Sequence, residues 1–393
     1  MQLRQPKDVG QQLNSVYGLK YLWWNFSIIG IHPPAGVRTH PVWRFLYLVY
    51  AVVINFLAGF CLPATMLANL MLLKSLEEII GNLSLSMTIA ISMTKELAIL
   101  YCRGGLLKAN HYLRLLDERC SAHPRDRMTV MEAVRMCHWY YTVYISFYGF
   151  CAIGFAYIGW SNHTLVYSAW FPNIFANDQT NYLAAYIFQN LAQTFTVFQN
   201  GNNDMYPLCY ITLMIYHVRA LADRIQRVGG DAETSAEENV QELRNCIQDH
   251  KNVQSYFECI QPAISSTMFQ QLWVAAFTLC LTAINLMAFE RTFAEKIFSV
   301  VYLGVIVIQI FPACLCVNFM MSETSNLTTA MYKCNWIEQN RNFRRMLIIF
   351  MQRSQKVNVI YAGGLAPVTL QTFVAIIKFS FSMYTILSQM KIQ

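Results

Sequence analysis

Long apolar segments alternate with short, polar and basic ones along most of this chain. The clearest apolar windows carry hardly a charge over close to twenty residues: Phe45 to Leu67, Trp139 to Trp160, Met268 to Phe289 and Ile297 to Met321. About twenty apolar residues in a helix cross the ~30 Å hydrocarbon core of a bilayer. Together with three weaker segments, the pattern predicts seven spans, at residues 42–66, 79–100, 138–160, 182–204, 265–289, 297–321 and 366–390. The expected fold class is an all-α, polytopic membrane protein.

Two of these spans are interrupted by polar residues. Lys95, Glu96 and several Ser and Thr break the second span. The fourth runs into "QNGNNDMYP", after which the apolar pattern resumes as "LCYITLMIYHV". One helix that continues beyond the bilayer and two short spans both fit this pattern. Ahead of the first span, "YLWWNFSIIGIHPP" predicts a re-entrant or interfacial segment, because tryptophans such as Trp23 and Trp24 suit a headgroup boundary.

Composition supports a membrane protein. Of 393 residues, 55% are hydrophobic and 13% are charged, with a mean hydropathy of +0.31. The charged share is half of the roughly 25% typical of soluble domains. The twelve cysteines show no pairs with metal-ligand spacing, and no metal site or cofactor is expected.

The distribution of Lys and Arg predicts the orientation of the spans. With the N-terminus inside, the inner segments hold 22 of these residues and the outer segments hold four. Cytoplasmic loops carry the excess of basic residues, so the N-terminus is expected in the cytoplasm and the C-terminus outside. The net charge of +7 then reflects topology and attraction to membrane lipid, and no nucleic acid is expected. The sequon at Asn162 falls in an outer loop, where glycosylation is expected, whereas the sequon at Asn326 falls inside.

The last predicted span, 366–390, carries a stripe of mostly polar residues: Gln371, Ala375, Lys378, Ser382, Thr385 and Gln389. Their spacing of 4, 3, 4, 3 and 4 residues places them on one helical face. Such a stripe either pairs with other helices of the same subunit or faces water. Lys378 near mid-span favours water, or a carboxylate such as Glu96. Copies of this helix around an axis would line a pore, which Ile386, beside the stripe, would narrow as a hydrophobic constriction.

The segment before this span combines a helix break with a basic amphipathic helix. "YAGGLAP" at residues 361–367 predicts the break. "CNWIEQNRNFRRMLIIFMQRSQK" predicts a helix in the cytoplasm or on the membrane surface, where a subunit contact is its expected role. The chain thus divides into an N-terminal segment (1–41), a six-span bundle (42–321), a cytoplasmic anchor with the break (322–365) and a pore-lining span (366–393).

The end of the chain resembles the insect odorant receptors. The resemblance rests on "MYKCNWIEQNRNFRRMLIIFMQRSQKVNVIYAGGLAPVTLQTFVAIIKFSFSMYTIL", with weaker likeness in "IIGIHPP" and "WFPNIF". It implies a subunit of a tetrameric, ligand-gated, non-selective cation channel in the plasma membrane of olfactory sensory neurons. The related gustatory receptors, the alternative within this class, end on a Thr-Tyr pair followed by Gln-Phe, which this chain lacks.

The resemblance also implies partners and roles. An odour-tuning subunit assembles as a heterotetramer with a shared co-receptor, and this chain lacks the long co-receptor insertion near residues 219–260. Ile386 would fall at the gate and Gln389 one turn outward, while Trp336, Arg353 and Gln355 would belong to the subunit anchor. Volatile odorants would bind in the outer half of the second, third, fourth and sixth spans. The candidates there are Met87, Tyr148, Phe150, Tyr157, Tyr186, Asn190 and Tyr302.

Aromatic residues and Met form an adaptable apolar cavity, although each of these side chains also fits ordinary packing between helices. The outer half shows no negative charge, so a neutral volatile is expected rather than an amine.

Other classes of protein fit less well. His-Glu-x-x-His, Gly-x-Ser-x-Gly and phosphate-loop motifs are missing from the sequence, so no enzyme is expected. A secondary transporter of a small organic solute is the main alternative from another class, because "QNGNNDMYP" fits a broken helix near mid-membrane. A metabotropic receptor is disfavoured by the charge distribution and by outer loops without cysteine.

Overall fold

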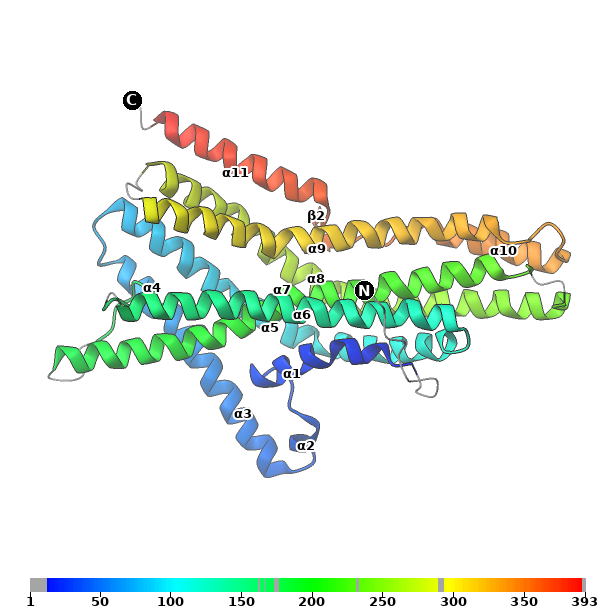
Figure 1. The fold of residues 1–393 in the computed structure, drawn as a ribbon, viewed down its shortest axis with the longest axis horizontal. Helices are drawn as coiled ribbons and strands as arrows, with labels where there is room; N and C mark the ends of the chain where they lie inside the picture. The colour runs from blue at the N-terminus through cyan, green and yellow to red at the C-terminus, as the bar shows by residue number, and fades with distance from the viewer. Residues whose placement is uncertain are drawn as a thin grey trace, which may run out of the picture.

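Helices longer than a bilayer is thick dominate the computed structural model (Figure 1), which describes residues 13–161, 163–165, 167–172, 177–230, 233–288 and 293–390. The N-terminal elements are η1 (Ser15–Leu19), α1 (Lys20–Ile28), α2 (Ala35–Arg38), α3 (Pro41–Asn55), the π-helical turn η2 (Phe56–Cys61) and α4 (Leu62–Leu70). The long helices are α5 (Leu76–Cys120), α6 (Pro124–Ser161), α7 (Asp178–Arg227), α8 (Ala236–Ala288) and α9 (Phe293–Lys333). The chain ends with α10 (Arg341–Ser354), β1 (Tyr361–Ala362), β2 (Ala366–Pro367) and α11 (Leu370–Met390).

These helices supply seven transmembrane segments. Among the described residues, five helices are long and apolar enough to span a membrane: Pro41–Leu70, Glu78–Cys120, Pro124–Ser161, Ala236–Leu286 and Ser299–Lys333. The other two are α7 at the centre of the bundle and α11, whose described apolar part is Leu370–Met383. The all-α, seven-span prediction is confirmed. The orientation of the termini stays a prediction.

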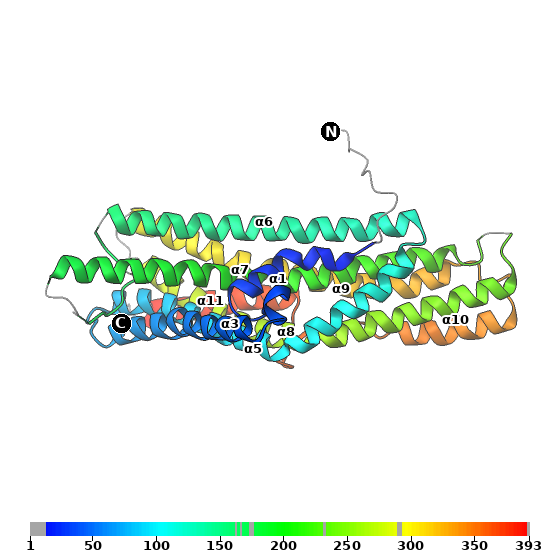
Figure 2. The same ribbon diagram turned by 90° about the horizontal axis from the view of Figure 1, so that it is seen from below.

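The long helices continue well past the predicted spans. Helix α8 has 53 residues, which at about 1.5 Å per residue is roughly 80 Å, against ~30 Å of hydrocarbon. The predicted spans 79–100 and 182–204 are therefore parts of α5 and α7, and the described part of the predicted span 265–289 belongs to α8. Figure 2 shows the excess length on one side, where α8 runs beside α10. We call α10 and the parts of α5 to α9 that extend beyond the predicted spans on this side the polar tier, and the parts within the predicted spans the membrane tier.

Helix α7 is the core of the bundle. Every residue from Gly201 to Ile215 is buried, because α5, α6, α8 and α9 all pack against this helix. A helix enclosed on all sides needs no apolar stripe, which explains why its sequence gave an ambiguous pattern. It is continuous through "QNGNNDMYP" despite Pro207, so the two-span alternative and the broken-helix interpretation are both wrong.

The helices α3 and α11 lie at opposite margins of the bundle (Figure 1). No described side chain of α3 is buried. Helix α11 contacts α8 and α9 along one face. There the ring centroids of Phe373 and Phe311 are 5.5 Å apart, and the Ser380 hydroxyl donates to the Ala276 carbonyl at 3.2 Å. Both helices therefore leave most of their surface to lipid or to other chains.

A short hairpin replaces the simple break expected before α11. Tyr361 pairs with Pro367 and Ala362 with Ala366 in antiparallel register. Gly363 has φ of +57° and donates its N–H to the Ser265 carbonyl at 3.1 Å. The left-handed backbone explains why glycine stands at the turn, and the contact fixes the hairpin on α8. The last helix begins at Leu370 rather than at residue 366.

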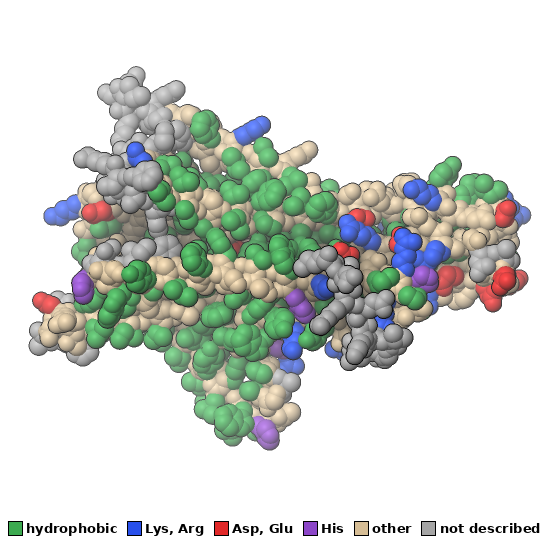
Figure 3. Space-filling model, in the orientation of Figure 1, with side chains coloured by type: hydrophobic (Ala, Val, Ile, Leu, Met, Phe, Trp, Pro, Cys, Tyr) green, Lys and Arg blue, Asp and Glu red, His purple; other side chains and the backbone are tan. Residues whose placement is uncertain are grey.

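The polar tier is held by charges and by a second apolar cluster. Figure 3 shows most of the Lys, Arg, Asp and Glu side chains at the end of the molecule where α10 lies. Arg219 pairs with Glu323 at 2.7 Å and Arg227 with Asp126 at 2.8 Å. The amphipathic helix predicted there is α10, which packs on the ends of α7, α8 and α9 through Phe343, Leu347 and Phe350.

Candidate functional site

Five polar side chains from five helices form a closed ring inside the bundle. We call it the central ring: Lys95 of α5, Tyr148 of α6, Asp204 of α7, Gln271 of α8 and Gln309 of α9. The Lys95 ammonium lies 3.9 Å from the Asp204 carboxylate and donates to the Gln271 carbonyl. Gln271 donates to Gln309 at 3.1 Å, Gln309 donates to the Tyr148 hydroxyl at 2.9 Å, and that hydroxyl donates to Asp204. Each helix of the inner bundle thus contributes one member.

The ring satisfies charges that the bilayer would otherwise penalise. Lys95 and Asp204 are both almost fully buried, and ionisable groups at this depth mark functional or coupling sites because they need a partner. A closed polar network also fixes the register of the helices that carry it. The structure thereby explains the interruption at Lys95. Asp204, its partner, was not identified from the sequence.

The predicted ligand residues fall into two groups. Tyr148 belongs to the central ring, and the Tyr302 hydroxyl lies 3.2 Å from the Thr88 hydroxyl, beside the half-buried Met87. The Tyr186 hydroxyl donates to the Ala156 carbonyl at 2.7 Å, and Asn190 donates to the Tyr186 carbonyl at 2.8 Å. These residues belong to the interior or to its edge.

The second group lies on the outer surface of α6. Phe150 is 77% exposed and Tyr157 is 71% exposed. The structure does not bring these two rings together with Tyr148 or Tyr302. Tyr148, Phe150 and Tyr157 all lie in the C-terminal half of α6, but only Tyr148 faces the interior of the bundle.

The connection between α6 and α7 closes this end of the bundle. We call residues 167–170 the roof segment. Tyr167 exchanges two hydrogen bonds with the Gln189 side chain, at 3.2 and 2.9 Å, and the Ser168 carbonyl accepts from Asn82 at 2.7 Å. The Trp170 N–H donates to the Thr65 carbonyl at 3.0 Å. These contacts were not predicted from the sequence, where the polar residues Asn82 and Gln189 within apolar segments are the signal that could have indicated them.

The polar stripe predicted for the last span, Gln371 to Gln389, lies on α11, and we call it the α11 stripe. Its described side chains face away from the bundle of their own chain. Gln371, Ala375, Lys378 and Ser382 are exposed, Thr385 is half-buried and Ile386 is 49% exposed. Lys378 does not pair with Glu96, which is buried within α5. The side chain of Gln389 lies outside the described residues.

The predicted anchor residues lie in the polar tier. Trp336 is half-buried and donates its indole N–H to the Tyr332 carbonyl at 3.2 Å. Arg353 and Gln355 are exposed at the end of α10, and Arg353 borders a hollow of about 610 Å³ between α8 and α10. Ile348 and Ile349 of α10 are also exposed, an apolar surface suited to a contact with another chain. Asn162 lies outside the described residues.

Comparison with known proteins gives the family. The model of the family described as 7tm odorant receptor matches residues 75–381. Odorant receptor 2a of Drosophila melanogaster is 27% identical over 398 residues, covering 97% of this chain and 98% of the relative. Odorant receptor 59a of the same organism is 29% identical over 401 residues, covering 97% and 99%.

A solved structure shares the fold. The insect olfactory receptor OR5 from Machilis hrabei, in complex with eugenol, superimposes with a TM-score of 0.75 at 18% identity, covering 96% of this chain and 99% of that chain. The relatives are receptors rather than enzymes. Because the family model matches most of the chain, this protein belongs to the 7tm odorant receptor family and is a multi-pass membrane protein.

Proposed function

We propose that this chain is an odour-tuning subunit of a ligand-gated, non-selective cation channel. The observation that carries the proposal is the exposed α11 stripe. One chain offers Gln371, Lys378 and Ser382 no cover, and lipid would penalise them. Several copies of α11 around an axis would place the stripe on a water-filled path. Ile386, exposed next to Thr385 and Ser382, would close this path as the gate, and Gln389 would follow one turn outward.

The odorant site belongs in the outer half of the bundle, between the central ring and the roof segment. Tyr302 and Met87 border this region on α9 and α5, Tyr186 and Asn190 border it on α7, and Tyr148 joins it to the ring. The charges of Lys95 and Asp204 are paired with each other, which favours a neutral volatile over a charged one. Phe150 and Tyr157 would contact lipid or a neighbouring chain from the outer face of α6.

The assembly follows from the two exposed regions. The α11 stripe and the polar tier, with Trp336, Arg353 and Gln355, would both contact other chains. We place the N-terminus in the cytoplasm, the roof segment and Asn162 outside, and the chain in the plasma membrane of olfactory sensory neurons. Its partner would be the shared co-receptor, in a heterotetramer that passes cations.

Whole-cell current tests this proposal. The chain is expressed with and without an insect odorant co-receptor and exposed to a panel of volatiles. Odour-evoked, non-selective cation current in co-expressing cells alone is the expected result. Current from this chain alone would contradict the need for a partner. Silence in both, with surface expression confirmed, together with saturable uptake of a volatile, would replace the channel with a transporter.

A further inference from the structure

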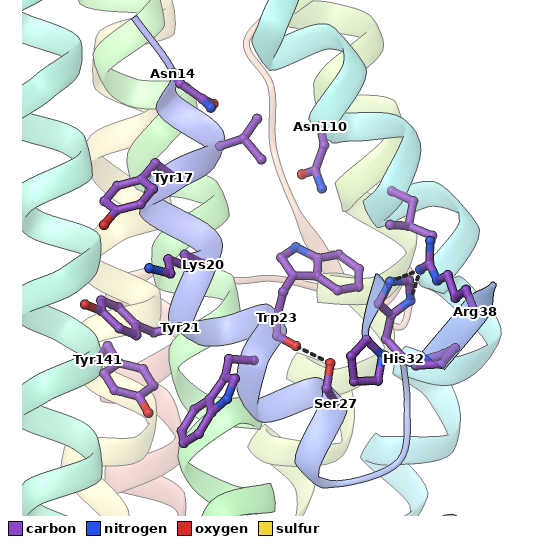
Figure 4. A pocket seen from close by; sticks show the side chains of 15 residues that line it. Asn14, Tyr17, Lys20, Tyr21, Trp23, Ser27, His32, Arg38, Asn110 and Tyr141 are labelled. Carbon is purple, nitrogen blue, oxygen red and sulfur yellow. Dashed lines mark hydrogen bonds between the residues drawn. The ribbon is translucent and has the colours of Figure 1, made fainter. Parts of the chain in front are cut away.

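A hollow of about 950 Å³ opens around α1, away from the outer half of the bundle (Figure 4). The N-terminal elements η1 and α1 line it, and the segment from His32 to Arg38, the last residue of α2, closes one edge. Leu107 and Asn110 of α5 and Tyr141 of α6 complete the walls. We call this hollow the α1 groove. The proposed odorant site does not use it.

The α1 groove lies at the boundary between the membrane tier and the polar tier. On α5 its residues Leu107 and Asn110 follow the predicted span 79–100, and on α6 Tyr141 is close to the start of span 138–160. Arg38 comes three residues before α3. Independent helices thus place the groove at one depth. At that depth lipid headgroups meet the acyl chains, and tryptophan is enriched there.

The charge of the groove suits an anion. Two of its lining residues, Lys20 and Arg38, are basic, and none of those found in the described part of the chain is acidic. They lie at opposite edges in Figure 4. The Lys20 ammonium is 5.2 Å from the Tyr17 ring and 5.7 Å from the Tyr21 ring, which keeps it on the aromatic edge.

Arg38 lies beside a neutral partner. Its guanidinium donates to the His32 ring. Burial, together with Arg38 and Arg103, lowers the pKa of His32 to about 4. The imidazole is therefore an uncharged acceptor at neutral pH, and Arg38 retains donors for an anion.

The groove also offers an acceptor and an apolar surface. The Oδ1 atom of Asn110 is buried without a hydrogen-bond partner among the described residues, so it suits a ligand that carries a donor. Trp24, which also lines the groove, is 57% exposed. The Tyr47 hydroxyl of α3 donates to the Ser27 carbonyl at 2.9 Å, which joins the groove to the exposed apolar face of α3. A soluble anion would leave this face unused, whereas two acyl chains would cover it.

We propose that the α1 groove binds an anionic glycerophospholipid from the leaflet on the N-terminal side, with its phosphate at Arg38. A headgroup hydroxyl or ammonium donates to Asn110. Lys20 attracts the headgroup from the opposite edge, and the acyl chains lie against Trp24 and α3. Because α1 and the segment from His32 to Arg38 line the groove together with α5 and α6, the lipid holds the N-terminal segment on the bundle.

Photolabelling tests the site on the full-length protein in nanodiscs. The probe is phosphatidylserine with a diazirine in one acyl chain, and adducts are mapped by mass spectrometry. We expect adducts on α1 and α3, which unlabelled phosphatidylserine removes at least fivefold better than phosphatidylcholine with the same acyl chains. Arg38→Gln should reduce this preference about fivefold, the effect of one basic residue near an anionic surface, and Lys20→Gln should reduce it less. Arg38→Lys should retain most of it.

The matched control is Arg341→Gln, an exposed basic residue at the start of α10, which should leave the preference unchanged. Equal competition by the two lipids, or an unchanged preference in Arg38→Gln, would overturn the proposal. Competition by inorganic phosphate as strong as that by phosphatidylserine would replace the lipid with a soluble anion.

If size-exclusion chromatography shows that Arg38→Gln does not fold, Asn110→Leu takes its place. This variant should lose the preference for phosphatidylserine and still be labelled by a phosphatidylcholine probe. If it kept the preference, the proposal would fail. None of these readouts requires current, so the result is independent of the proposed channel function.

Discussion

Two helices of this protein carry the same kind of polar stripe and have opposite surroundings. Gln189, Gln193, Thr196, Gln199 and Asn203 follow one face of α7 with spacings of 4, 3, 3 and 4, and each is at most 4% exposed. The α11 stripe has nearly the same spacing and is mostly exposed. A polar stripe on a membrane helix therefore predicts a polar environment. Whether that environment comes from the same chain, from another chain or from water depends on the neighbours of the helix.

The partners of the two stripes show the difference. On α7, Gln189 bonds with the roof segment, Gln199 donates to Asn55 of α3 at 3.1 Å, and Asn203 donates to the Ser92 carbonyl of α5 at 3.5 Å. This stripe joins helices within the chain. On α11, the Thr385 hydroxyl donates to the Ser382 carbonyl of its own helix at 2.7 Å. The α11 stripe needs other chains or water, which is the physical basis of the proposed pore.

The largest effect is expected where α7 contributes a charge to the central ring. Asp204→Leu leaves the buried Lys95 ammonium without its counter-charge, which typically costs about 3–5 kcal/mol. We expect little folded protein at the cell surface and a strongly lowered melting temperature in detergent, measured by surface biotinylation and scanning fluorimetry. The double variant Lys95→Met with Asp204→Leu should recover much of the loss. If the single variant were as stable as the parent, the ring would not hold the bundle.

A smaller effect separates the two stripes directly. Gln189→Leu removes both hydrogen bonds to the Tyr167 backbone and should cost about 1–3 kcal/mol, seen as a lower melting temperature. Gln371→Leu makes the same chemical change on the exposed stripe of α11 and should shift stability by less than ~0.5 kcal/mol in the isolated chain. Equal shifts in the two variants would mean that the stripes do not differ in environment.

The contrast also marks what the sequence could predict. Hydropathy identified α3 and α9 because these helices face lipid on much of their surface. It could not define α7, whose buried face is polar and whose neighbours enclose it. Tyr148 and Phe150 were both assigned to the ligand site. Residues two positions apart point about 200° away from each other around a helix, so Tyr148 is buried and Phe150 is exposed. Which face of α6 is buried depends on the helices that pack against it, and the sequence alone does not identify them.

The central ring shows the same limit. Lys95 was visible as an interruption of the second span. Its partner Asp204 was hidden within "QNGNNDMYP", and the pairing joins α5 to α7 across 109 positions of the chain. The break near Gly363 was predicted from glycine and proline alone, because the left-handed backbone there is a local property.

A more modest effect is expected in the polar tier, at the buried Asp117. Asp117, beyond the membrane part of α5, accepts from the Ser15 N–H at 2.8 Å and lies 3.6 Å from His217. Burial raises the pKa of Asp117 to about 7, while burial and Arg224 lower the pKa of His217 to about 3. An unfolded aspartate titrates near 3.9, so the folded protein binds this proton more tightly than the unfolded chain.

The stabilisation from this proton is present below about pH 4 and is lost as the pH rises toward 7. Between pH 5 and 7, where His217 stays neutral in the folded state, the melting temperature of Asp117→Asn should therefore fall less with rising pH than that of the parent. The exposed Asp178→Asn serves as control and should follow the parent curve. Parallel curves for the parent and Asp117→Asn would show that Asp117 does not carry the pH dependence.

The smallest change in stability, and the sharpest functional one, is expected on α11. Ile386 is half exposed in the isolated chain, so Ile386→Ser should barely move the melting temperature. In the assembled channel the same change would place a hydroxyl in a hydrophobic constriction and let water enter it. We expect a several-fold higher basal current in cells with the co-receptor, with the ranking of activating odorants unchanged.

Ile377→Ser is the matched control. Ile377 comes nine positions before Ile386, which places it on the opposite face of α11, and its exposure is similar. It should leave the basal current as in the parent. A leak from Ile377→Ser and none from Ile386→Ser would mean that the other face of α11 lines the path. The α11 stripe would then form hydrogen bonds with neighbouring helices, as the stripe on α7 does, but those helices would belong to other subunits.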